Sequence, residues 1–338
     1  MADCYYRPIA RTDHIRPEGA LLLAGGWTWF DMAEEITRDG TSRLIHASNL
    51  PDKTLGRLTA PRAPICGLSF ETPRLMGILN VTPDSFSDGG RHNAPDAAIA
   101  HTNAMIAGGA DMIDVGGEST RPGAEPVPVA DEIARTAPVI AAIRGQSDVP
   151  ISIDTRKTPV ACAAHEAGAN LVNDVAGFTF DDTLAPYCAE NALPVCVMHA
   201  QGRPETMQND PRYDHPALDI YDWLSERVDA LVAAGIARDQ IIIDPGIGFG
   251  KTRAHNLVLL QNLSLFHGLG CPILLGASRK RFIGDLSGVN EASERVPGSL
   301  AVAIAGVAQG IQMLRIHDVA ETAAALKLWQ AATGGEPA

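Results

Sequence analysis

Three polar residues each follow a short apolar run of the chain: Asp154, Asn173 and Asp244. A buried carboxylate or amide needs a partner, because an unpaired polar group costs free energy in apolar surroundings. Other side chains of the protein could supply that partner. So could the N–H, amino and carbonyl edges of a flat heterocycle, since Asp and Asn offer complementary donors and acceptors. Met198 and Phe249 could pack on the faces of such a ring, although each alone is typical of a core.

A long polar loop, NVTPDSFSDGG (80–90), follows the apolar run LMGIL. It is dense in side-chain oxygens and has one aromatic residue, Phe86. This composition is typical of a mobile segment that grips a ligand, although an ordinary surface loop is the simpler alternative.

A second long polar loop, DMIDVGGESTRPGAEPV (111–127), carries Arg121 and Pro122. The forked guanidinium suits a phosphate or a carboxylate, and the proline stiffens the chain. An arginine before proline is usually a solvated loop charge. Here a ligand role is favoured, because a buried strand end precedes the loop, with Asp114 and Glu118 nearby.

Positive charges gather late in the chain. In GASRKRFIG (276–284) they begin at a strand end, and we expect Lys280 to point into a site. In RIHDVAET (315–322), Arg315 and His317 alternate along one strand and face the same side. A helix begins immediately afterwards, and a helix N-terminus favours an anion. Charge runs are usually solvated and a lone His is usually structural, but this arrangement predicts an anion site.

The segment DPGIGFGKT (244–252) has the glycines of a nucleotide-binding loop but fits neither common motif. A P-loop needs glycine five residues before Gly250, where this chain has Pro245. The dinucleotide fingerprint needs a last glycine where this chain has Lys251. We interpret the segment as a strand-to-helix turn that brings the backbone close to a ligand.

Eight apolar runs place these residues at strand ends. Each is short and almost continuously apolar, as in parallel strands buried on both faces. The predicted strands are RLMGILNV (74–81), MIDVGG (112–117), PISIDT (150–155), LVNDV (171–175), PVCVMH (194–199), IIIDPG (241–246), PILLGAS (272–278) and MLRIHD (313–318). Predicted helices cover 96–110, 129–145, 217–236, 254–270 and 319–333. Pro138 is expected to kink or split the second helix.

Eight strand–helix units over about 260 residues predict an α/β fold, a (β/α)8 TIM barrel with an N-terminal extension. A doubly wound open sheet is the alternative. The polar residues favour the barrel, because barrel active sites are built at the C-terminal ends of many strands.

Residues 1–71, the N-terminal extension, do not follow this pattern. An apolar cluster around Trp27 and Phe30 precedes a predicted short helix, and TAPRAP (59–64) is typical of a linker. We expect the extension to pack on the barrel or to present an interaction surface. The barrel is expected over residues 72–334.

Composition excludes several classes of protein. The 338 residues are 46% hydrophobic, which is typical of a globular chain. A net charge of −13 disfavours nucleic-acid or anionic-membrane partners, so an anionic substrate would need a local basic cluster. Six cysteines without C-x-x-C spacing indicate reduced thiols in a cytoplasmic protein. No secretory signal or membrane-length apolar run is found.

In these motifs the chain resembles the dihydropteroate synthase family of pterin-binding barrels. The resemblance covers about residues 72–333, with the family's signatures in order. It implies a transferase of folate biosynthesis that joins 6-hydroxymethyl-7,8-dihydropterin diphosphate to 4-aminobenzoate, giving 7,8-dihydropteroate and diphosphate. It also implies Mg2+ as cofactor, a homodimer and a sulfonamide target. Sulfonamide sensitivity itself depends on fine packing that the sequence does not give.

The resemblance further implies roles for matching residues. The catalytic residues would be Asn80, Arg121, Asp154 and Lys280. The pterin would contact Asp154, Asn173, Met198, Asp244, Phe249 and Lys280. The diphosphate would contact Asn80, Thr120, Arg121, Arg315 and His317. The aminobenzoate would contact Phe86, Thr120, Pro122 and Ser278. Asn80 would also contact Mg2+, while the roles of Asp84 and Asp114 stay open.

Two other functions compete. A pterin-binding methyltransferase, which moves a methyl group from a methylated tetrahydrofolate to a corrinoid partner, would not need the grip on diphosphate. Four basic residues and the two full loops argue against it; the residues are Arg121, Lys280, Arg315 and His317. A non-catalytic paralogue would have lost a loop or a diphosphate ligand, and none is missing. The departures from the family pattern are the extension and Ala200, where a bulkier residue is expected.

Overall fold

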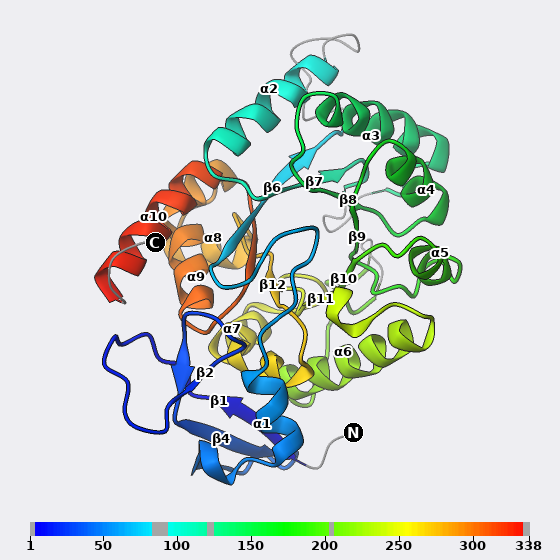
Figure 1. Ribbon diagram of the computed structural model, residues 1–338. Helices are drawn as coiled ribbons and strands as arrows, with labels where there is room; N and C mark the ends of the chain where they lie inside the picture. Colours follow the sequence, from blue (N-terminus) through cyan, green and yellow to red (C-terminus); the bar gives the residue numbers. More distant parts are fainter. Residues whose placement is uncertain (1–3, 83–93, 120–124, 203–205, 334–338) are drawn as a thin grey trace.

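The computed structural model describes residues 4–82, 94–119, 125–202 and 206–333. Within these residues, eight parallel strands run side by side in the order β11-β10-β9-β8-β7-β6-β13-β12 (Figure 1). The strands are β6 (Arg74–Asn80), β7 (Met112–Gly116), β8 (Ile151–Asp154), β9 (Leu171–Asp174), β10 (Val195–Met198), β11 (Ile241–Asp244), β12 (Leu274–Leu275) and β13 (Met313–Ile316).

The two ends of this sheet meet. Ile243 of β11 and Ile273, next to β12, form a parallel bridge, and the Ile243 amide donates to the Pro272 carbonyl at 3.0 Å. The sheet is therefore a closed barrel, as predicted, and the open-sheet alternative is wrong. Helices surround it: α2 (Ala94–Ala107), α3 (Val129–Arg144), α4 (Thr158–Glu166), α5 (Leu184–Glu190), α6 (Pro216–Ala233), α7 (Arg253–Gln261), α8 (Arg281–Ser287), α9 (Val296–Val307) and α10 (Val319–Thr333).

The barrel interior begins with an apolar layer at the N-terminal ends of the strands. It joins one side chain from most strands: Met76, Met112, Leu171, Cys196, Ile242, Leu274 and Met313. Ile65 and Phe70, from the segment before β6, pack in the same cluster and close this end. Because side chains alternate along a strand, the residues two positions later point inward again, toward the opposite mouth.

Two helix predictions need correction. Helix α3 continues through Pro138, so a split there is wrong, and buried Val139 and Ile140 hold the helix on the barrel; a kink at Pro138 stays a prediction. The predicted helix 254–270 is divided at Asn262 into α7 and a 3-10 helix, η4 (Leu263–Leu269), which ends at Gly270 in the left-handed conformation.

The N-terminal extension forms elements of its own (Figure 1). Strands β1 (Cys4–Pro8), β4 (Met32–Thr37) and β5 (Ser42–His46) make an antiparallel sheet, and β2 (Leu21–Leu22) pairs with β3 (Trp29–Phe30). The short helix predicted after Phe30 is wrong: pairing with β1 and β5 overrides the helix preference of Met-Ala-Glu-Glu. A helix, α1 (Asp52–Thr59), leads toward the barrel.

The extension packs on the outside of the barrel through specific hydrogen bonds. Ser264 of η4 donates to the Pro8 carbonyl at 2.9 Å, and the Trp27 indole donates to the Val307 carbonyl at 2.9 Å. The division at residues 71 and 72 into two domains stays a prediction. None of the described helices is both long and apolar enough to cross a membrane.

Candidate active site

The polar residues of the strand ends meet inside the barrel. Asp114, Asn173, Asp244 and Arg315 each lie two residues beyond a member of the apolar layer, so alternation directs them inward. Asp154 joins them from β8. A polar layer therefore covers the apolar one, at the C-terminal mouth where barrel enzymes place their chemistry.

Arg315 is the centre of this layer. Its Nε lies 2.6 Å from Oδ2 of Asp114, and its Nη2 lies 2.8 Å from Oδ2 of Asp154. Burial opposes the positive charge, but the two carboxylates outweigh it and raise the pKa of Arg315. The Nδ2 atom of Asn173 lies 3.4 Å from both carboxylate oxygens of Asp114. These groups thus satisfy one another without a ligand.

Burial raises the pKa of Asp154 to about 7, and the nearby Asp114 charge adds to that shift while Arg315 opposes it. Burial also raises the pKa of Asp244, whose Oδ1 accepts a 2.7 Å hydrogen bond from the Gly246 amide. Both carboxyls are therefore poised to bind a group that brings N–H donors or positive charge.

Lys280 extends into the same region from the segment after β12. Its Nζ donates to the Ile247 carbonyl and lies 4.2 Å from the centroid of the Phe249 ring. Burial lowers the pKa of Lys280 to about 7, against the attraction of Asp244. Its neighbours Arg279 and Arg281 turn away: the first pairs with Asp318, and the second is 91% exposed.

The turn 244–252 supports this arrangement. A Cβ at Gly246 would lie 1.9 Å from the His199 carbonyl oxygen, and its φ of +69° favours glycine. A Cβ at Gly248 would lie 3.0 Å from Cδ of Lys280. The segment is the predicted strand-to-helix turn, and its backbone approaches another loop and Lys280 closely.

Ser278 and His317 meet at the rim. Ser278 Oγ lies 3.0 Å from His317 Nδ1 and accepts the His317 amide at 3.2 Å. The resemblance implies that His317 binds diphosphate and that Ser278 binds aminobenzoate, and the two side chains are in contact. Arg315, also expected at the diphosphate, contacts Asp114 and Asp154 instead. Met198 is buried at the end of β10, beside Asp244 in the strand register.

Asn80 ends β6 at the same edge of the sheet as Asp154. A Cβ at Gly116 would lie 3.7 Å from Oδ1 of Asn80 and 3.6 Å from Cβ of Asp154, so Gly116 lies next to both side chains. An amide oxygen here suits Mg2+, which takes oxygen ligands and commonly completes its shell with phosphate oxygens and water. Among the described residues, no three His, Cys, Asp or Glu side chains form a metal site.

Four predicted site residues, Phe86, Thr120, Arg121 and Pro122, lie outside the described residues, as does Asp84.

Conversely, sequence reasoning gave no role to Lys251. Its buried Nζ contacts His199 Nδ1 at 2.9 Å and the Phe249 carbonyl at 2.9 Å. The only sequence signal was a lysine within an apolar, glycine-rich turn.

Comparison with known proteins places this site in a family. Residues 76–317 match the pterin-binding enzyme family. The chain is 46% identical to dihydropteroate synthase of Escherichia coli K12 over 264 residues, which are 78% of this chain and 93% of the relative. It belongs to the dihydropteroate synthase family of pterin-binding enzymes. The resemblance seen in the motifs is thus confirmed.

Solved members of the dihydropteroate synthase family share the fold. The Xanthomonas albilineans enzyme with 4-aminobenzoic acid is 44% identical, with a TM-score of 0.76 over 80% of this chain and 98% of that one. The Yersinia pestis enzyme, in a sulfonamide drug complex, is 44% identical, with a TM-score of 0.75 and the same coverage. The X. albilineans enzyme in complex with 7,8-dihydropteroate is 41% identical, with a TM-score of 0.73 over 80% of this chain and 98% of that one.

Proposed function

We propose that this protein is a dihydropteroate synthase, a transferase that joins 6-hydroxymethyl-7,8-dihydropterin diphosphate to 4-aminobenzoate in folate biosynthesis. The observation that carries the proposal is the match of the whole barrel to named dihydropteroate synthases, at 46% identity over 93% of the E. coli enzyme. The buried layer around Arg315 supports it, because its carboxyl and amide groups complement the polar edge of a pterin.

In this proposal the pterin lies against Asp154, Asn173 and Asp244, with Met198, Phe249 and Lys280 around it. Ring N–H and amino groups would donate to the two buried carboxylates, whose pKa values are raised by burial. Binding would therefore favour their ionised forms.

The diphosphate would lie toward Asn80, Arg315 and His317, with Thr120 and Arg121 from the second loop. The bond between the pterin methylene carbon and the diphosphate oxygen breaks first, and its electron pair leaves with the diphosphate. Arg315, which also pairs with Asp114 and Asp154, would offset part of the negative charge that grows on that group. Asn80 would hold Mg2+, which when bound supplies further positive charge to the diphosphate.

Loss of diphosphate leaves a cationic pterin methylene. The ionised carboxylates of Asp154 and Asp244 would stabilise this cation electrostatically. The amine nitrogen of 4-aminobenzoate, framed by Ser278, Phe86, Thr120 and Pro122, then forms the C–N bond and loses a proton. Exclusion of water matters, because water would otherwise capture the cation.

The test follows dihydropteroate and diphosphate in a mixture of purified protein, Mg2+ and both substrates. The wild-type protein should form both products in equal amounts. Arg315→Met should lower turnover by about 10²-fold or more, as for loss of other groups that stabilise developing charge. Arg281→Met, at an exposed position in the same basic run, is the matched control and should retain activity.

Breaking a buried ion pair destabilises proteins by about 3–5 kcal/mol, so the folding of Arg315→Met must be checked. Arg315→Lys, which retains a positive charge, is the second variant. Tight pterin binding by the wild-type protein without either product would overturn the proposal and point to methyl transfer or a non-catalytic barrel.

Finer features are also proposed. We propose a homodimer built through late helices, where Leu286 of α8 and Leu328 of α10 are exposed apolar side chains. Light scattering of the purified protein would test it.

We propose a cytoplasmic location, which fits six cysteines that are all described and all free. The aminobenzoate site is proposed as a sulfonamide target.

A further inference from the structure

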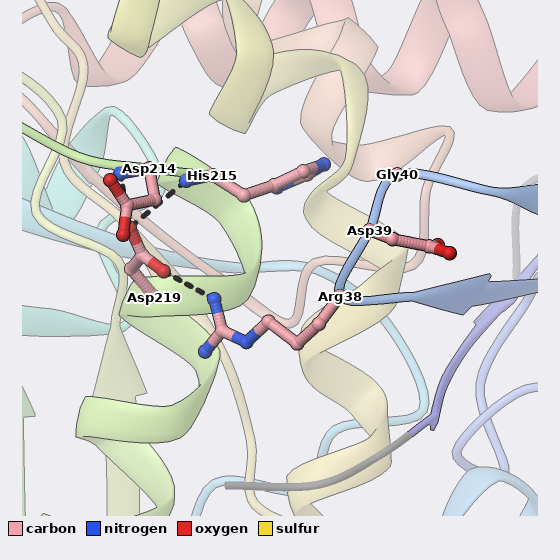
Figure 2. A pocket seen from close by; sticks show the side chains of 6 residues that line it. All are labelled: Arg38, Asp39, Gly40, Asp214, His215 and Asp219. Atoms are coloured by element: carbon pink, nitrogen blue, oxygen red, sulfur yellow. Dashed lines mark hydrogen bonds and ion pairs between the residues drawn. The ribbon is translucent and has the colours of Figure 1, made fainter.

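The N-terminal extension lies outside residues 76–317, which carry the family match, yet it contacts the first turns of α6, the helix that follows β10. Figure 2 shows Arg38 and Gly40, from the turn between β4 and β5, facing Asp214, His215 and Asp219 where α6 begins. A cavity of about 380 Å³ separates the two sides. Arg38 spans it.

Both terminal nitrogens of the Arg38 guanidinium group donate to carboxylates of α6. Nη1 donates to Oδ1 of Asp219 and Nη2 donates to Oδ2 of Asp222. Tyr5 of β1 donates to the same Asp222 oxygen at 2.8 Å, and the Arg38 guanidinium lies 5.5 Å from the centre of the Tyr5 ring. Asp222 is only 12% exposed, so these charges are partly shielded from water. Strand β1 and the turn between β4 and β5 thus both contact the first turns of α6.

Asp219 also contacts the segment that precedes α6. Its second oxygen, Oδ2, accepts the backbone amides of Asp214 at 2.9 Å and His215 at 3.1 Å. The His215 ring in turn accepts the Leu218 amide and caps α6. One carboxylate therefore holds both the extension and the last residues of the segment between β10 and α6.

That segment, described over residues 206–215, contacts the glycine turn. The Tyr213 hydroxyl donates to the Gly250 carbonyl at 2.8 Å, and Gln208 Nε2 donates to the Gly248 carbonyl at 2.7 Å. The same turn supplies Phe249 and the Ile247 carbonyl, which are the two partners of the Lys280 ammonium. A continuous chain of contacts thus leads from the extension to Lys280.

We propose that Arg38 is a positioning residue: through Asp219 and Tyr213 it holds the glycine turn so that Phe249 and Lys280 keep the geometry needed to bind the pterin. This inference rests on the proposed function for its substrate. The contacts themselves do not depend on that function. The extension is then an external brace for the pterin pocket rather than only a fold element.

Arg38→Met tests the proposal, because methionine keeps the apolar stem and removes the fork. Arg43→Met is the matched control: Arg43 lies in the same sheet, is 74% exposed and pairs with Glu35 within the extension. Two readouts are compared, the hydrogen exchange of residues 206–215 and the steady-state kinetics with dihydropterin diphosphate. Thermal unfolding is recorded for every variant.

Arg38→Met should speed exchange at Asp214 and His215 by about fivefold or more, and it should raise KM for dihydropterin diphosphate by about fivefold, within the range of coupled contacts. The kcat should change by less than about twofold, because contacts that hold ground state and transition state alike affect KM. Arg43→Met should change neither readout. Arg38→Lys, which keeps a positive charge, should have exchange rates and a KM between those of Arg38→Met and wild type.

Tyr213→Phe removes the contact to Gly250 and should raise the same KM. If both residues act along one chain of contacts, the double variant should raise KM by less than the product of the single effects. Multiplicative effects, or an Arg38→Met variant that only unfolds earlier and keeps wild-type exchange and KM, would overturn the proposal. If the wild-type protein formed no product, the synthase function would fail, while the exchange data would still decide the role of Arg38.

Discussion

The ammonium nitrogen of Lys280 lies 4.2 Å from the centroid of the Phe249 ring. The two residues come from different loops, after β12 and after β11. The charge of Asp244, at the end of β11, attracts the Lys280 ammonium. Burial makes the charged ammonium costly, so the negative face of the ring helps Lys280 to stay protonated near neutral pH.

Phe249→Leu should therefore weaken pterin binding. Loss of the ring face favours neutral Lys280, and cation–π contacts are worth about 0.5–2 kcal/mol, which is a factor of about 2–30 in affinity. Calorimetric titration with 6-hydroxymethyl-7,8-dihydropterin at pH 7.5 measures the effect. Phe249→Trp, which keeps an aromatic face, is the control, and equal affinity of the leucine variant and wild type would contradict this role.

The pH dependence of kcat/KM should show an acidic limb from Asp154. Its carboxyl has a pKa of about 7 in the free enzyme and takes up a proton below that pH, so its negative charge is lost as the pH falls. We expect kcat/KM to fall as pH decreases through about 7. Asp154→Asn should be slower at all pH values and should lack this limb; a limb at the same pH in the variant would assign it to another group.

Asp174 should make the protein less stable as pH rises. Burial raises its pKa from 3.8 to about 7, although its oxygens accept the Ala176 and Phe178 amides at 2.7 Å each. The folded state therefore holds more protons than the unfolded state between about pH 4 and 7, and stability falls with rising pH across that window.

Asp174→Asn should flatten this dependence in urea unfolding at pH 4.5–7.5. The amide loses one acceptor, so the variant should be less stable than wild type by about 1–3 kcal/mol at the acidic end. An unchanged slope in the variant would show that other groups, Asp154 among them, account for it.

Asn80→Ala should raise the Mg2+ concentration that gives half-maximal turnover by about tenfold or more, comparable with losses seen when metal sites are altered. Its amide oxygen is a hard donor and lies next to Gly116 and Asp154 at the C-terminal ends of the strands. Turnover is measured across an Mg2+ titration at saturating substrates. Asn80→Asp, which keeps an oxygen, should need less Mg2+ than the alanine variant, and an unaltered titration for Asn80→Ala would remove Asn80 as a ligand.

Lys251→Met should destabilise the protein and loosen the pterin pocket together. The buried Lys251 amino group joins His199 to the Phe249 carbonyl, and buried acceptors left without a donor cost about 1–3 kcal/mol each. Urea unfolding and KM for dihydropterin diphosphate should both change. Lys251→Gln, which keeps an N–H donor, should have a stability and a KM between those of Lys251→Met and wild type. A Met variant with wild-type stability would refute the role of this contact.

Much of the site was predictable because strand alternation is local. Once β7 and β13 were recognised as buried strands, Asp114 and Arg315 had to point into the barrel at their C-terminal mouth. Their direct contact was not predictable. The sequence analysis assigned Arg315 to the diphosphate and left Asp114 open, whereas the structure pairs the two at 2.6 Å.

The extension shows the opposite balance. Met32–Thr37 has a helix-favouring composition but forms β4, because its neighbours in the sheet lie earlier and later in the chain. The contact of Arg38 with Asp219 joins residues that are 181 positions apart, and no local pattern encodes such a pairing.

The sequence by itself determined the family, the barrel and the inward-facing polar residues, since periodicity and contiguous motifs are properties of short segments. Only the tertiary structure decided which charges neutralise each other, that Lys251 is buried between two loops, and that the extension braces α6. Those features depend on burial and on contacts across the closed barrel, where a charge's partner is set by distance in space rather than by spacing along the chain.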